Sequence, residues 1–150
     1  MRNYTYYARE ILGYPVDFPE DMIQKFAKAQ LIIAGADGLS APELEECHGL
    51  GRVFGATDET IAAIEKFDFR KANFEESFPP EIKAYARQFI YFAVRICSAD
   101  NEYSQEERAH VRKAATFMGV GEDVVKTIEG IVAAEQGLRA ARIAILSAGM

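Results

Sequence analysis

The segment ADGLSAPE at residues 36–43 recurs as ADNEYSQEE at residues 99–107, and these two stretches decide the fold. In each, a serine (Ser40 or Ser104) is followed three residues later by a glutamate. In such a capping box the serine side chain accepts a free N–H of the first helical turn, and the glutamate accepts the N–H of the serine. The two stretches therefore predict two helices, each beginning just after an acidic turn.

The sequence on both sides of these turns repeats as well. Residues 22–37 align with residues 85–100 at an offset of 63, and from Ser40 onward the offset becomes 64, which pairs Glu43 with Glu107. The matched positions are turn, cap and core residues. The chain therefore contains an internal duplication.

Each repeat unit is interpreted as a long helix, an acidic turn, a second helix, a glycine turn and a third helix. Gly55 and Gly119 are paired by the repeat, and each stands where a helix closes with a left-handed residue. Two such triples stacked face to face would form a pseudo-two-fold bundle with one continuous core. We place the two repeats at about residues 19–67 and 80–131.

Apolar residues recur at helical spacing along nearly the whole chain, and strand alternation is not convincing anywhere. We expect an all-α, compact bundle of seven to eight helices built from the two pseudo-symmetric triples, forming a single domain over residues 1–150. The one long connection, residues 67–80, carries four phenylalanines, which predicts that it lies against the bundle. One long helix is expected over residues 82–96.

The two ends of the chain carry further apolar residues. Helical spacing continues past Gly137, and the segment 140–150 is expected to cap the core. Aromatic residues crowd the first eighteen positions and predict a strap packed across the bundle. The alternative for these aromatics is a dimer face, because aromatic residues are enriched at interface cores.

Composition excludes several classes of protein. The 150 residues include 17 basic and 23 acidic side chains, for a net charge of −6, which argues against a nucleic-acid partner. The richest apolar stretch, residues 89–99, is too short to span a membrane and contains Arg95, so no integral membrane segment is expected. The first residues lack the apolar run of a signal peptide, so we expect a cytoplasmic protein. Cys47 and Cys97 are expected to be reduced, buried thiols.

The two acidic turns also resemble the signature of a known family. The order alanine, aspartate, a small residue, serine and a helix-opening glutamate is similar to that of the TerB-like family, which includes the tellurite-resistance protein TerB and the N-terminal domain of the co-chaperone DjlA. The first turn is one residue shorter than the second, and Asn101 stands where glycine is usual. The resemblance covers about residues 19–131. It implies an all-helical, non-enzymatic stress-response module of the tellurite-resistance type with an acidic, metal-chelating surface.

The acidic turns are also candidate metal ligands from their own chemistry. Each turn, with the start of the following helix, holds four acids and no neighbouring base, and an oxygen-binding cation relieves such repulsion. Oxygen ligands favour Ca²⁺, Mg²⁺ or Mn²⁺, and no organic cofactor is expected. The expected main ligands are Asp37, Glu43, Asp100 and Glu107, and the auxiliary ligands are Glu46, Glu102 and Glu106.

Two other interpretations of the acids stay open. Helix capping and turn formation explain the same residues without any ligand. The acids could instead form a face that docks a basic protein partner without metal. An EF-hand is excluded, because Gln105 and Val111 stand where its glycine and bidentate glutamate are required.

An enzyme is not expected. Glu45 with His48, and Glu107 with His110, have the Glu-x-x-His spacing of di-iron bundles, but the two pairs fall out of register in the repeat. No phosphate-binding glycine loop or nucleophile elbow is present. A protein partner and a homodimer are both left open.

Overall fold

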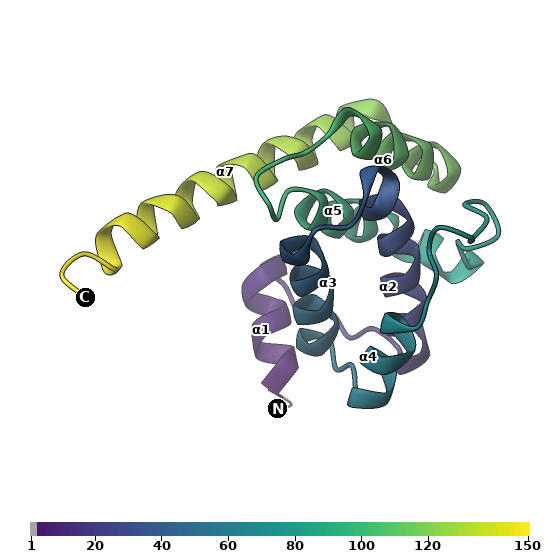
Figure 1. Cartoon of the computed structure of the whole chain (residues 1–150), viewed down its shortest axis with the longest axis horizontal. Coiled ribbons are helices and arrows are strands. Elements are labelled where there is room, and N and C mark those ends of the chain that lie inside the picture. The colour runs from purple at the N-terminus through teal and green to yellow at the C-terminus, as the bar shows by residue number, and fades with distance from the viewer. Residues whose placement is uncertain (1–2) are drawn as a thin grey trace.

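The computed structural model describes the backbone of residues 3–150 and the side chains from residue 6 onward. Within that range the chain forms seven α-helices and two short 3-10 helices and no β-strand, which confirms the all-α class (Figure 1). The elements in chain order are α1 (Asn3–Leu12), α2 (Glu20–Ala34), η1 (Gly35–Asp37), α3 (Ala41–Val53), α4 (Asp58–Glu65), η2 (Pro80–Tyr85), α5 (Ala86–Cys97), α6 (Gln105–Met118) and α7 (Glu122–Leu146).

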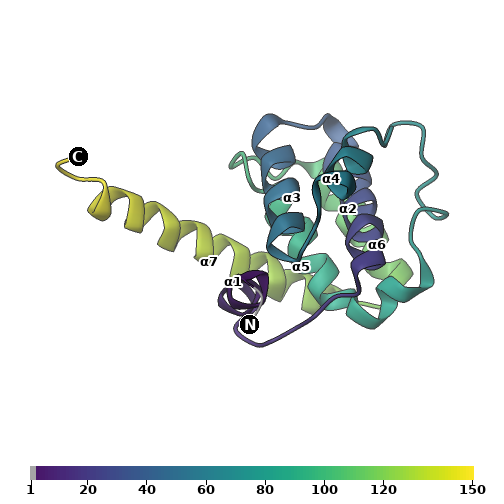
Figure 2. The ribbon, with the colours of Figure 1, turned by 90° about the horizontal axis from the view of Figure 1, so that it is seen from below.

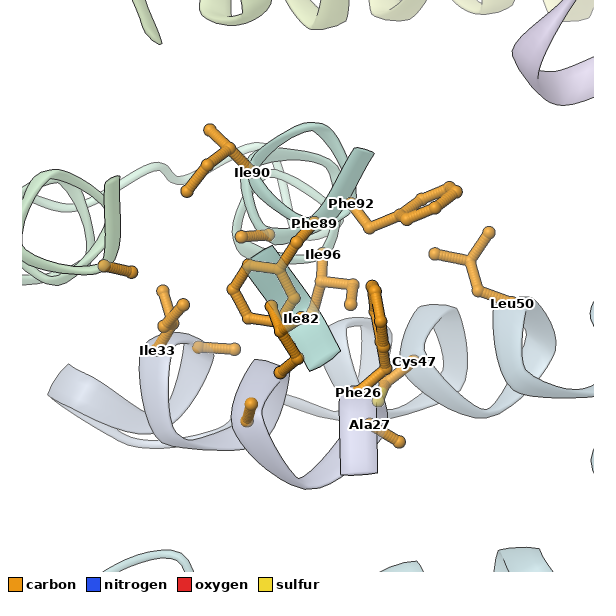
Figure 3. Close-up of a cluster of buried hydrophobic side chains, with 14 of the residues drawn as sticks. Phe26, Ala27, Ile33, Cys47, Leu50, Ile82, Phe89, Ile90, Phe92 and Ile96 are labelled. Carbon is orange, nitrogen blue, oxygen red and sulfur yellow. The ribbon is translucent and has the colours of Figure 1, made fainter. Parts of the chain in front are cut away.

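Helix α5 is the centre of the bundle. It contacts α2, α3, α6 and α7, and its residues Phe89 and Cys97 are fully buried. Figure 3 shows Phe89 and Ile96 directed from α5 toward Phe26 and Ile33 of α2. The Phe89 ring meets the Phe26 ring edge to face at 5.4 Å between centroids. Such contacts between repeat-related helices α2 and α5 give the two halves a common core.

The predicted helix boundaries at the acidic turns are confirmed. Ser40 and Ser104 are the N-caps of α3 and α6, and each belongs to a complete capping box. Gly119 closes α6 with a φ of 77°, and Gly55 follows α3 with a φ of 103°, a backbone conformation that favours glycine. The elements follow the expected order, and the two-fold relation between the triples stays a prediction.

The connection between α4 and η2 lies against the bundle, as its phenylalanines predict. Phe78 is 5% exposed, and Phe67, Phe69 and Phe74 pack partly buried on the core. The Phe69 ring lies directly on the backbone of Gly35, so that a Cβ at that position would overlap it. The connection is therefore held against the first residue of η1. The domain limits 1–150 stay a prediction.

One helix differs from expectation. The helix expected over residues 82–96 is divided into η2 and α5, and the division falls at Tyr85, whose φ of −121° is not helical. By contrast, α7 is one helix of 25 residues that continues past Gly137, as the apolar spacing predicts. A glycine inside a helix costs about 1 kcal/mol relative to alanine, which is too little to end a long helix.

The expectation that segment 140–150 caps the core is wrong. The second half of α7 projects away from the other helices (Figures 1 and 2), and every residue from 137 to 150 is exposed. The apolar side chains of this segment are therefore not buried in the core. Across residues 3–150, none of the helices combines the length and the apolar character that crossing a bilayer requires.

At the N-terminus the aromatic residues divide into two groups. Phe18 is buried and packs against Phe26, Phe54 and Tyr85. The side chains of Tyr6, Tyr7 and Tyr14 are exposed, and the side chain of Tyr4 lies outside the described residues. Helix α1 also packs on the bundle, against α3, but through Ala8, Ile11 and Leu12 rather than through its tyrosines.

Candidate functional site

Two glutamates at the starts of α3 and α6 use one oxygen each to cap their helix. Glu43 Oε1 accepts the N–H of Ser40 at 2.9 Å, and Glu107 Oε1 accepts the N–H of Ser104 at 3.0 Å. In return, the serine hydroxyls accept the N–H groups of Glu43 and Glu107 at 3.3 and 3.1 Å. These reciprocal bonds fix both carboxylates in place, so the sequence of the turn determines where the acid group stands.

The fold then brings the two carboxylates together in its interior. Each glutamate is 2% exposed, although an acid at a helix start is ordinarily solvated. One oxygen of Glu43, one oxygen of Glu107 and the Sγ of Cys97 all lie within 4.8 Å of one another. Cys97 is the last residue of α5 and is fully buried. The cluster therefore joins the end of the central helix to the starts of the two helices that carry the acidic turns.

The second oxygen of each glutamate lacks a partner. Neither Glu43 Oε2 nor Glu107 Oε2 receives a hydrogen bond, although both atoms are buried. A buried polar atom without a hydrogen-bond partner lowers the free energy of unfolding by about 1–3 kcal/mol, and a charged carboxylate oxygen lowers it by more. A proton or a cation between the two carboxyl groups would remove this cost.

The electrostatics of the cluster reflect burial and like charge. Burial, with the neighbouring Glu43 carboxyl group, raises the pKa of Glu107 from its ordinary 4.5 to about 8, against the opposing effect of the Ser104 N–H. Burial also raises the pKa of the Cys97 thiol, and the Glu107 and Glu43 carboxylates raise it further. In the absence of a metal ion, burial and like charge therefore favour one proton on the Glu43–Glu107 pair at neutral pH, and Cys97 stays a thiol.

Of the other expected ligands, Asp37 is the one whose charge acts on the cluster. It ends η1, which packs against α6, and its exposed carboxylate adds to the negative charge that raises the pKa values of Glu107 and Cys97. Asp100 accepts the backbone N–H of Glu102 at 2.9 Å, which is a turn interaction.

Glu46 faces a different neighbour. Its Oε1 accepts Arg95 Nε at 2.6 Å, so its charge is already paired. Glu102 and Glu106 are exposed. The structure thus brings together Glu43 and Glu107, places Asp37 at the edge, and leaves Asp100, Glu46, Glu102 and Glu106 outside the buried cluster; their role as ligands stays a prediction.

Sequence reasoning did not assign Cys97 to the site. The spacing predicts that Cys97 belongs to an apolar helical face, and the structure places it on the buried face of α5. The offset of 63 pairs Cys97 with Ala34, so that at this position only the second unit carries a thiol, and this difference between the repeats was a usable signal.

Glu65 and Glu129, which the offset of 64 also pairs, do not enter the site. Glu65 is exposed, whereas Glu129 forms ion pairs with Arg112 at 2.8 Å and with Arg108 at 3.3 Å. These arginines, with burial opposing them, hold the pKa of Glu129 below its ordinary value. Its role is structural, because it fastens α7 to α6.

Comparison with known proteins identifies the fold. No family model matches the chain, and no curated protein matches its sequence. A crystal structure of a tellurite resistance protein from Nostoc punctiforme superposes with a TM-score of 0.81 at 24% sequence identity, covering 96% of this chain and 91% of that protein. The chain has the fold of that protein. The match supports, at the level of the fold, the resemblance to the TerB-like family that the acidic turns indicate.

Proposed function

We propose that the chain is a non-enzymatic, TerB-like stress-response module that binds one divalent cation between the starts of α3 and α6. The observation that carries the proposal is the buried pair of Glu43 and Glu107, whose Oε2 atoms have no hydrogen-bond partner. The fold adds support, because the Nostoc protein that shares it is named as a tellurite resistance protein. We infer a role of the same kind for this chain, in the cytoplasm.

A cation fits this cluster better than it fits the exposed acids. Two carboxylate oxygens and a sulfur converge within 4.8 Å, and Asp37 adds negative charge at the edge. Ca²⁺ requires six to eight oxygen ligands, and Mg²⁺ retains several waters, so a buried group of three donors suits neither ion well. A donor set with one sulfur favours Zn²⁺, and carboxylates also suit Mn²⁺. We therefore place Zn²⁺ and Mn²⁺ ahead of Ca²⁺ and Mg²⁺.

Binding is expected to depend on pH. The cation must displace the proton of Glu107, whose pKa is about 8, and that of the Cys97 thiol if the sulfur is a ligand. Affinity should therefore rise as the pH increases from 6 to 8, with release of protons.

The deciding experiment is thermal unfolding of chelator-treated protein, titrated with Zn²⁺, Mn²⁺, Ca²⁺ and Mg²⁺ in turn. An ion at one hundred times its dissociation constant adds about 2.7 kcal/mol to the free energy of unfolding. For a chain of this size that corresponds to a rise in Tm of about 5–10 °C. Glu107→Gln should abolish the rise, because it removes one ligand charge.

Glu106→Gln is the matched control for this experiment. Glu106 precedes Glu107 in the same helical turn but is exposed, so its substitution should leave the ion response unchanged. A flat response to all four ions contradicts the proposal. A response that survives Glu107→Gln and disappears in Glu106→Gln would move the site to the exposed acids.

One observation favours a second candidate function, an acidic docking face for a basic partner. Glu45, Glu102 and Glu106 are exposed near the starts of α3 and α6, and none of them forms an ion pair with a side chain from residue 6 onward. Their charge is free to attract a basic peptide. Binding of a lysine-rich peptide that weakens with salt and with Glu102→Gln, while the ion response persists, would support this function.

A further inference from the structure

The second half of α7 presents large apolar side chains to solvent. Leu138 is 64% exposed, Ile145 is 75% exposed and Leu146 is 72% exposed. This half projects from the bundle as a straight continuation of the helix (Figure 1), and Figure 2 shows the same projection in the perpendicular view. A contiguous apolar face of this kind on a polar protein marks an interaction surface.

The residues of the exposed face follow a regular pattern of size, and this pattern indicates what kind of surface would fit against it. Large and small residues alternate along one side of the helix at intervals of three and four residues. We call this set the α7 seam: Ile131, Ala134, Leu138, Ala141 and Ile145. The spacing is that of a heptad, with a large residue at every a position and alanine at every d position.

An antiparallel copy of the same helix fits this seam. When two seams run in opposite directions, a positions face d positions, so Leu138 lies opposite Ala141 of the second copy and Ala134 lies opposite Ile145. Leu138 and Ile145 then each meet an alanine, which allows the helix axes to approach at the short end of the usual 8–10 Å. Gly137 flanks the seam and gives no obstruction.

Charge also selects the antiparallel arrangement. Glu135 and Arg142 occupy equivalent flanking positions, seven residues apart. Antiparallel pairing places Glu135 of each copy beside Arg142 of the other, whereas parallel pairing in register would set each of them opposite a glycine, Gly130 or Gly137, and would form no ion pair. Arg142 has no acidic partner among the side chains that the structure describes, and Glu135 is held in place by the Tyr91 hydroxyl, which donates to Oε2 at 2.7 Å. We propose that the chain forms a two-fold homodimer through antiparallel packing of the α7 seam.

The bundle provides a place for the end of the second copy's helix. A groove of about 870 Å³ adjoins the root of the seam and is lined in part by Ile11, Leu12 and Ile131. The two antiparallel helices would cross near residue 140 of each copy. At about 1.5 Å of rise per residue, the C-terminal end of the second copy's α7 then reaches the groove. Its Leu146 and Met150, which are 72% and fully exposed in one chain, then reach the apolar lining of the groove.

The first test is the molecular mass in solution, measured by sedimentation and by light scattering over a range of concentrations. The protein should reach twice its single-chain mass of 16.7 kDa. Ile145→Asp should raise the dimer dissociation constant at least a hundredfold. Ile143→Asp is the matched control: it makes the same change two residues away, at an isoleucine that is 57% exposed but outside the seam, and it should leave the dimer intact. Circular dichroism establishes that both variants fold.

The second test measures orientation. Ala134→Cys protein mixed with Ile145→Cys protein should form the mixed disulfide under mild oxidation, while neither variant cross-links to itself. The native Cys47 and Cys97 are buried and do not compete. A wild-type protein that stays monomeric at every concentration overturns the proposal. Equal dissociation by Ile143→Asp, or cross-linking of each variant only to itself, overturns it as well.

Discussion

Replacing Glu107 with glutamine should stabilise the ion-free protein above neutral pH. The amide oxygen of glutamine can still accept the Ser104 N–H, which the Glu107 Oε1 accepts at 3.0 Å. Its NH₂ group takes the place of the second oxygen and can donate to Glu43 without any titratable proton. The variant thus replaces a carboxyl pair that requires a proton with a pair that is satisfied at every pH.

The magnitude follows from the pKa of Glu107. In the unfolded chain its pKa is 4.5 and in the folded protein about 8, so between these values the folded state binds more protons. The stabilising contribution of this group is fully present below pH 4.5 and is lost as the pH rises to 8. The loss reaches about 1.4 kcal/mol per pH unit. Between pH 5 and pH 8 the variant should therefore gain up to about 4 kcal/mol over the wild type.

Urea unfolding of chelator-treated protein at several pH values measures this difference directly. The free energies of unfolding of the two proteins should be similar at pH 5, and the difference between them should grow steadily to pH 8. In thermal unfolding at pH 8, the Tm of the variant should be on the order of 10 °C higher. Comparison at each pH cancels the titration of the groups that do not interact with Glu107. Glu106→Gln, at an exposed neighbour, should follow the wild type throughout. A difference that does not change with pH would refute the assignment of a shared proton to the Glu43–Glu107 pair.

Three further predictions concern the cap, the connection and the thiols. Ser104→Ala should lower the free energy of unfolding by about 1 kcal/mol in chemical denaturation, because it removes the acceptor of the capping box; no change would mean that this cap is not formed. Gly35→Ala should destabilise the protein by about 1–3 kcal/mol, because its Cβ overlaps the Phe69 ring, and proteolysis of the connection between α4 and η2 should become faster. Burial raises the pKa of the Cys47 thiol to about 12 and raises that of Cys97 as well, so neither should react with a thiol reagent before unfolding, as a colorimetric assay with and without denaturant would show.

Local sequence predicts the helix boundaries well because each depends on a few neighbouring residues. The caps at Ser40 and Ser104 and the left-handed Gly119 require only contacts within one turn, and the structure confirms all three. The division of the helix expected over residues 82–96 was missed because apolar spacing is nearly the same in a 3-10 turn and an α-helix over six residues. Tyr85 shows where the backbone departs from the helix, and nothing in the spacing marks it.

The candidate site could be predicted only in part. The turns predict Glu43 and Glu107 as ligands, but the burial of these residues depends on how α3 and α6 meet, which is a long-range contact. Cys97 enters the cluster for the same reason. The exposed seam of α7 was misread because the spacing of Leu138 and Ile145 is identical whether a helix packs on its own core or on another chain.

The two oxygens of each buried glutamate have separate tasks, and this restricts how the sequence can change. One oxygen of Glu43 or Glu107 completes a helix cap, and the other faces the opposite carboxyl group. Alanine removes both interactions. Glutamine preserves the cap and exchanges the carboxyl pair for a pair of one amide and one carboxyl group. The exchange of glutamate for glutamine therefore separates the two tasks, because the helix start is kept while the carboxyl pair is lost.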